Sequence, residues 1–155
     1  MELITDRTQA DVNRWKALRD KGLHGMNTDE LTEWLGEMKG RYAHTDMNRV
    51  ENAVAEVARQ LRSLGYDVPS LFLKTDWNER SIPTRADFDR YFGNVETLRG
   101  IFPLPATTPK TPTTESRLDY VAANDLEKIL VEVDAMIQKL VSARYYAGDI
   151  FAGEV

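Results

Sequence analysis

The sequence contains no cysteine, only two histidines, and no long run of apolar residues. The absence of cysteine excludes structural disulfides and thiolate metal sites, and it leaves the redox compartment open. No stretch approaches the roughly 18 apolar residues of a membrane-spanning helix, so we expect no membrane insertion. The opening MELITDRTQADVNRW carries acidic side chains and no apolar segment, which is not the pattern of a signal peptide.

Basic charge is also scarce. The formal net charge is −5, and no run of three or more Lys or Arg residues occurs, which argues against a nucleic-acid binder. The chain has 155 residues, of which 42% are hydrophobic and 29% are charged. This composition is typical of one globular domain that is large enough to bury a core.

Five segments show helical periodicity. Apolar residues at three- and four-residue spacing predict helices over residues 7–21, 27–39, 45–64, 84–98 and 118–146. The first two are expected to form an antiparallel hairpin, with Trp15 and Trp34 on their apolar faces and in the core. The last helix has a wide apolar stripe formed by Leu126, Ile129, Leu130, Val133, Met136, Ile137, Leu140 and Ala143. A stripe of this width favours packing within the chain, while a trimer or larger bundle stays open.

We therefore predict an all-α fold of about five helices in a bundle, arranged as two hairpin-like halves around the long C-terminal helix. Residues 1–102 form the main helical region and include an irregular segment between Pro69 and Pro83. Within it, SLFLKTDW is either a short strand or an extended crossing. Residues 103–117 form a connector with four of the six prolines and five threonines, which either extends into solvent or runs across the bundle. Residues 118–155 complete the same domain.

No residue pattern indicates catalysis. His24 and His44 lack the converging partners that a zinc site or a catalytic triad needs. The clustered carboxylates fall on first helical turns or polar faces, where solvent exposure is expected; they are Asp29, Glu30, Glu33, Glu37, Asp87, Asp89, Asp125, Glu127, Glu132 and Asp134. No G-x-S-x-G, H-E-x-x-H, phosphate-binding Gly loop or EF-hand loop is present. We expect no enzyme activity, no catalytic or metal-binding residues and no cofactor.

Candidate interaction residues are aromatic and aliphatic instead. Trp77, in the irregular segment, either pins that loop to the core or serves as an exposed anchor for a partner. The chain closes with YYAGDIFAGEV, where Gly148 is expected to end the helix and to begin a short extended tail. That tail either folds back on the bundle or docks on a neighbouring subunit. The candidate interaction set is Trp77, Tyr145, Tyr146, Ile150, Phe151 and Val155.

Several stretches, in order, resemble a known group of proteins. They are TDRTQADVNRWKALRDKG, LTEWLGEMKGRYAHTDMNRVENAV, LGYDV, KTDWNERSIPTRADFDRYFGNVETLR, ANDLEKILVEVDAMI and AGDIFAGEV. Together they are similar to small proteins of phages and prophages of Gram-positive gut bacteria, whose genes lie among tail and baseplate genes. The similarity spans nearly the whole chain except the Pro/Thr connector, and its motifs are specific only as a set.

This resemblance implies a structural or assembly component of a phage tail tip or baseplate, made in the host cytoplasm and located in the virion. It implies other tail or baseplate proteins as partners, with self-association in a three-fold or six-fold assembly. It implies no catalytic residue, and the acidic composition adds the expectation of no nucleic-acid partner. The alternative is an intracellular, phage-encoded acidic protein that binds a host protein.

Overall fold

The computed structural model describes residues 2–115 and 118–152, and within these it contains five α-helices, one short 3-10 helix and no strand. The helices are α1 (Gln9–Lys21), η1 (Leu23–Gly25), α2 (Thr28–Leu35), α3 (His44–Ser63), α4 (Arg85–Arg99) and α5 (Tyr120–Ala152). The predicted all-α class and the long C-terminal helix are confirmed. The second helix ends four residues before its predicted limit, because the backbone becomes extended at Gly36, whose N–H makes the last bonds to the carbonyls of Thr32 and Glu33.

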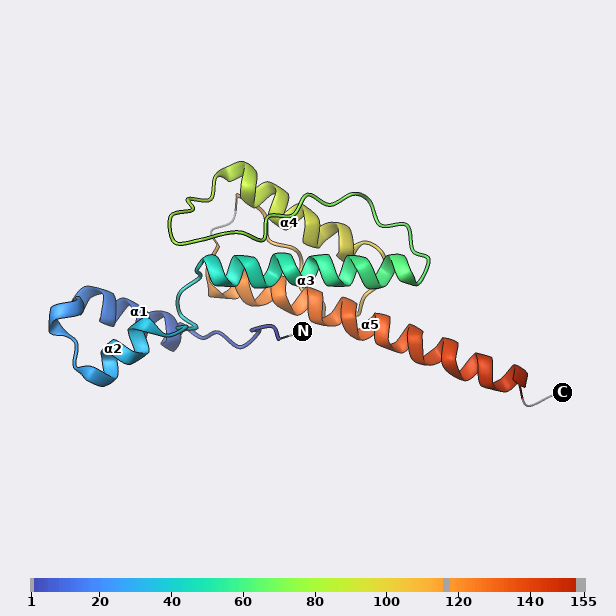
Figure 1. The fold of residues 1–155 in the computed structure, drawn as a ribbon, viewed down its shortest axis with the longest axis horizontal. Coiled ribbons are helices and arrows are strands. Elements are labelled where there is room, and N and C mark those ends of the chain that lie inside the picture. The colour runs from blue at the N-terminus through green and yellow to red at the C-terminus, as the bar shows by residue number, and fades with distance from the viewer. Residues whose placement is uncertain (1, 116–117, 153–155) are drawn as a thin grey trace.

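Helices α3, α4 and α5 form the bundle, and the α1–α2 hairpin lies beside one end of it (Figure 1). The predicted hairpin is present, and the rings of Trp15 and Trp34 stack across it at 6.5 Å. Both indoles are only half-buried, so they form a small cluster of their own. Leu18 and Met26 are the buried apolar residues of this hairpin.

The three bundle helices run in the same direction, which corrects the predicted arrangement of two hairpin-like halves (Figure 1). Contacts between α3 and α5 show this directly. Arg49 bonds Glu127 near the helix starts, Gln60 lies 3.5 Å from Gln138 further along, and both pairs are 78 residues apart in sequence. Helices that run in parallel need long return connections, which explains the two long non-helical segments of the chain.

The core lies entirely among these three helices and the first return connection. Its members are Met47, Val50, Ala53, Val54, Val57, Ala58 and Leu61 from α3, Tyr91, Phe92, Val95 and Leu98 from α4, Leu126, Ile129, Leu130, Val133 and Ile137 from α5, and Val68 and Trp77. These five α5 residues of the predicted stripe therefore pack within the chain, as the width of the stripe predicted, whereas Ala143 near its end is exposed.

The first return connection, residues 64–84, crosses the bundle in extended form without becoming a strand. Trp77 pins it, because its side chain is only 4% exposed and belongs to the core. Asn48 of α3 secures the same residue through its side-chain amide. It accepts from the Trp77 backbone N–H at 2.9 Å and donates to the Trp77 carbonyl at 2.8 Å. Of the two interpretations of Trp77, the exposed anchor is therefore wrong.

The Pro/Thr connector runs across the bundle surface rather than into solvent. Thr108 is buried and its hydroxyl bonds Glu132 of α5, while Thr111 and Thr114 bond Glu96 and Asp89 of α4. Its threonines thus serve as regularly placed donors to carboxylates of two helices.

The C-terminal segment differs from its prediction, because α5 continues through Gly148 to Ala152. A single glycine inside a helix costs only about 1 kcal/mol relative to alanine, which the long helix before it offsets. The expected extended conformation from residue 147 onward is therefore wrong as far as Ala152. Val155 lies outside the described residues.

Candidate functional site

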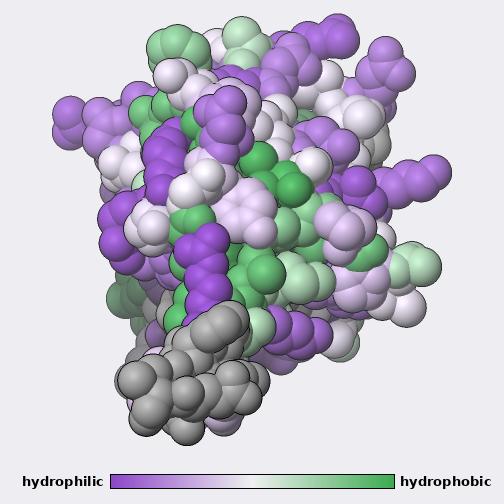
Figure 2. Space-filling view, turned by 90° about the vertical axis from the view of Figure 1, so that its right-hand side faces the viewer, coloured by the Kyte–Doolittle hydropathy of each residue, from purple (hydrophilic) through white to green (hydrophobic). Residues whose placement is uncertain are grey.

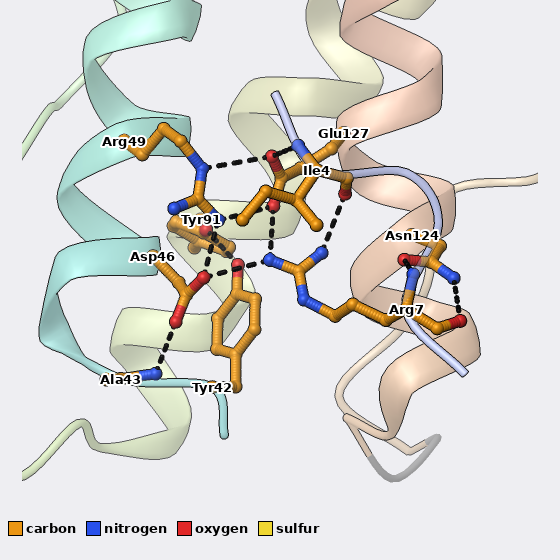
Figure 3. Close-up of polar contacts among 9 residues, drawn as sticks. All are labelled: Ile4, Arg7, Tyr42, Ala43, Asp46, Arg49, Tyr91, Asn124 and Glu127. Atoms are coloured by element: carbon orange, nitrogen blue, oxygen red, sulfur yellow. Dashed lines mark hydrogen bonds and ion pairs between the residues drawn. The ribbon is translucent and has the colours of Figure 1, made fainter. Parts of the chain in front are cut away.

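A cluster of buried charged side chains joins the start of the chain to the bundle (Figure 3). Arg7 comes from the extended segment 2–8, which we call the strap. Asp46 and Arg49 come from the first turns of α3, and Glu127 comes from α5. Two arginines and two carboxylates give the cluster no net formal charge. Figure 3 shows the strap running between α3 and α5.

Arg7 holds the strap through both ends of its guanidinium. Its Nη2 donates to Glu127 at 2.7 Å and to Asp46 at 2.9 Å, and its Nη1 donates to the carbonyl of Ile4 at 2.7 Å. Its backbone is also fixed, since the N–H donates to Asn124 Oδ1 at 3.0 Å and the carbonyl accepts from Asn124 Nδ2 at 2.9 Å. The strap is thus recognised by side chain and main chain together.

Glu127 is the centre of the cluster and is completely buried. Besides Arg7, it accepts from the Ile4 backbone N–H at 2.6 Å and from Arg49 Nε and Nη2 at 3.1 and 2.9 Å. Asp46 accepts from the same Nη2 of Arg49 and also from the Ala43 backbone N–H, which satisfies a free donor at the start of α3. Each buried carboxylate is therefore paired, as burial of charge requires.

Two tyrosines line the next layer of this site. The hydroxyls of Tyr42 and Tyr91 lie 2.6 Å apart, and Tyr42 also faces the Arg7 guanidinium at 5.5 Å from its ring centre. Burial raises the pKa of both phenols well above the usual value, because a phenolate would lose its hydration there.

These tyrosines set an expected alkaline limit of stability. A raised folded-state pKa contributes stability that is present below the unfolded value of about 10 and is lost as the pH rises above it. We expect the free energy of unfolding to fall above about pH 10, by about 1.4 kcal/mol per pH unit for each tyrosine. Urea titrations at pH 9 to 11.5 measure this slope. Tyr91→Phe should make it shallower, and an equal slope in that variant would contradict the assignment.

A second buried ion pair lies beside the first cluster. Arg90 of α4 binds Glu51 of α3 through two bonds of 2.6 and 3.0 Å, and Glu51 is 1% exposed. Arg90 also donates to the Phe72 carbonyl at 2.7 Å, and the side-chain amide of Asn94 donates to the same carbonyl at 2.8 Å. This pair therefore holds the return connection against both helices.

Sequence reasoning missed this charged interior. It placed Glu127 on a solvated helix face and assigned no role to Glu51, whereas both glutamates are buried. A signal was present, because Glu127 lies three residues before Leu130 and Glu51 lies three residues before Val54. Both glutamates therefore share the buried face of their helices. Arg7 carries no such signal, because it opens the predicted 7–21 segment ahead of the apolar residues that define its stripe, and α1 itself begins only at Gln9.

The other predicted site residues are dispersed. Tyr145 and Tyr146 are 71% and 67% exposed near the end of α5. Trp77 is buried, so it is withdrawn from the interaction set. Ile150 and Phe151 lie on the last turns of α5, where only the backbone is described, and Val155 lies outside the described residues.

Each buried carboxylate of this interior faces an arginine: Asp46 and Glu127 pair with Arg7 and Arg49, and Glu51 pairs with Arg90. In the part of the chain that the structure describes, no group of three or more His, Asp or Glu side chains is placed to hold a metal ion. Within the same residues, no helix is both long and apolar enough to cross a membrane.

Comparison with known proteins finds no matching family, no matching curated protein and no matching solved structure.

Proposed function

We propose that this protein is a structural or assembly component that works through protein–protein contacts, in the tail tip or baseplate of a phage particle. The observation that carries the proposal is the free end of α5, which extends beyond the ends of α3 and α4 (Figure 1). Arg144 Nη2 donates to the Leu64 carbonyl at 2.8 Å, where α3 has just ended. The helix continues for two further turns past this contact.

The free helix end carries the type of side chain that anchors protein interfaces. Tyr145 and Tyr146 are exposed, their rings pack edge to face at 6.2 Å, and Val141 one turn earlier is 45% exposed. Tyrosine is enriched at interface centres because it combines a large apolar surface with a hydroxyl group. Such a surface is a liability for a protein that works alone, and it suits one that is covered in an assembly.

The adjoining end of the bundle supports the same reading. Partly buried apolar residues follow the ends of α3 and α4 and complete the core there; they are Leu64, Tyr66, Ile101, Phe102 and Leu104. Figure 2 faces this end and shows apolar side chains near the centre of the view with polar ones around them. A partner that binds the free helix end would therefore meet an apolar surface beside it.

The particular setting in a phage tail is supported by the resemblance of the sequence to proteins encoded in tail and baseplate regions. A stiff bundle with a free helix is suited to such a particle, because neighbouring subunits cover surfaces that a single subunit leaves exposed. The proposal assigns no catalytic step to any residue.

The test replaces the two tyrosines together, Tyr145→Ser with Tyr146→Ser, in the phage that encodes the chain. Both side chains are exposed, so we expect an unchanged unfolding midpoint and at least a tenfold loss of the chain from purified particles. Lys139→Ser, at another exposed position of α5, is the control and should be incorporated normally. Normal incorporation of the tyrosine variant would contradict the role of this helix end.

A further inference from the structure

The strap and the α1–α2 hairpin form one continuous segment that joins the bundle through the strap. We call residues 2–40 the arm. Its buried apolar residues Leu18 and Met26 do not belong to the bundle core, to which the arm contributes only the half-buried Leu3, while its buried Arg7 lies in the charged cluster. Figure 1 shows the hairpin set apart from α3, α4 and α5.

The arm is held together internally where it returns to the bundle. A Cβ at Gly40 would lie 2.0 Å from the Asp11 carbonyl oxygen, so this glycine packs directly on the start of α1. Lys39 adds an ion pair to Asp6 of the strap at 2.6 Å. Tyr42, two residues later, already belongs to the bundle through its bond to Tyr91. The only covalent hinge between arm and bundle is therefore at Arg41, which is exposed.

Polar contacts, rather than a shared core, attach the arm to the bundle. Arg7 and Ile4 bind Glu127, Asp46 and Asn124 through the bonds described above. The junction between hairpin and bundle is hollow, with a cavity of about 350 Å³ lined by Val12, Lys16 and Gly40 on the arm side and by Leu118, Tyr120 and Ala123 on the bundle side. The arm thus relies on one binding position between α3 and α5, formed by Asp46, Asn124 and Glu127, which we call the slot.

We propose that two copies of this chain exchange arms, so that the strap of each copy occupies the α3–α5 slot of the other. The occupant is defined by the slot itself, which already binds the main chain of Ile4 and Arg7 and the Arg7 guanidinium. A second copy offers the identical segment, and every contact of the closed form is remade in the exchanged pair. Only the hinge and the entropy of association differ, so the exchanged dimer is favoured at high local concentration.

A reciprocal exchange gives a closed two-fold dimer in which each slot contains a residue of the partner. The proposal does not rest on the tail role, since the chain and a second copy of it are sufficient. It also leaves the free end of α5 uncovered, so both contacts can be made in one particle.

The test uses the full chain and a single spin label, for which the absence of cysteine provides a clean background. A Thr5→Cys chain at natural isotopic abundance carries the spin label on its strap. It is mixed with wild-type chain labelled with ¹⁵N. If arms are exchanged, the amides of residues 124–127 in the ¹⁵N chain lose most of their intensity. Light scattering on the same sample should show a species of twice 17.7 kDa.

Two controls make the result specific. The same label at Thr75, an exposed position of the return connection, should leave those amides unaffected. The same strap label combined with Arg7→Gln should broaden them much less, because that arm lacks the guanidinium that the slot binds. A dimer without broadening at residues 124–127, or a monomer at every concentration, would overturn the proposal.

Discussion

Replacing Glu127 with glutamine is expected to lower the free energy of unfolding by about 3–5 kcal/mol, because it removes one partner from a buried ion cluster. The side chain is completely buried and accepts from Arg7, Arg49 and the Ile4 N–H. Glutamine keeps the shape of the side chain but leaves the buried Arg7 and the partly buried Arg49 with Asp46 as their single carboxylate. Urea unfolding followed by circular dichroism gives the difference.

A matched control separates burial from charge. Glu56 binds Arg59 at 2.6 Å, a distance like those in the cluster, but this pair is on the surface of α3. Glu56→Gln should leave the unfolding midpoint almost unchanged, since exposed ion pairs contribute little. A Glu127→Gln variant as stable as the Glu56→Gln variant would contradict a structural role for the cluster.

The double variant Arg7→Gln with Glu127→Gln extends this test. It removes one charge of each sign and restores neutrality, so its loss should be smaller than the sum of the two single losses. Simple additivity would mean that Arg7 and Glu127 do not interact in the folded protein.

Replacing Gly40 with alanine is expected to loosen the arm and to cost about 1–3 kcal/mol, as for an overpacked site. The new methyl group would lie 2.0 Å from the Asp11 carbonyl oxygen, 2.4 Å from its carbon and 2.8 Å from the Val12 nitrogen. All three are backbone atoms, so the start of α1 has to move. Hydrogen exchange should then become faster in α1 and α2 while α3, α4 and α5 keep their protection.

Gly93 provides the opposite case on the same chain. It lies inside α4, and a Cβ there would meet nothing within 4 Å. Gly93→Ala should therefore stabilise the protein by about 0.5–1 kcal/mol through helix propensity alone. If Gly40→Ala raised the free energy of unfolding as Gly93→Ala is expected to do, the close approach of Gly40 to the start of α1 would be disproved.

Helices were predictable from this sequence because their signals are local. The apolar stripes of α3 and α5 and the capping boxes at Asn27 and Thr84 identify their elements within a few residues. The direction of the helices was not predictable in the same way. A long irregular segment is compatible with a turn or with a return crossing, and only the packing of Trp77 against α3 decides between them.

The site depended on information that no local pattern carries. Arg7 and Glu127 are 120 residues apart, and Arg7 lies in an extended strap without periodicity. A glutamate inside an apolar stripe indicates a buried carboxylate that needs a cationic partner, but the identity of that partner becomes known only from the folded structure. The prediction of where α5 ends was wrong for another reason. It considered the helix-breaking cost of Gly148 without the stability of the long helix that precedes it.

The central claim is that this chain is a part of an assembled particle, and quantitative mass spectrometry of purified phage particles tests it most directly. The account predicts a few copies per particle in a multiple of three, counted against the major tail protein. An exchanged pair of arms would require an even number as well, so six copies satisfy both proposals. Absence of the chain from particles, together with abundance in the lysate, would contradict the structural role and would favour the host-protein binder.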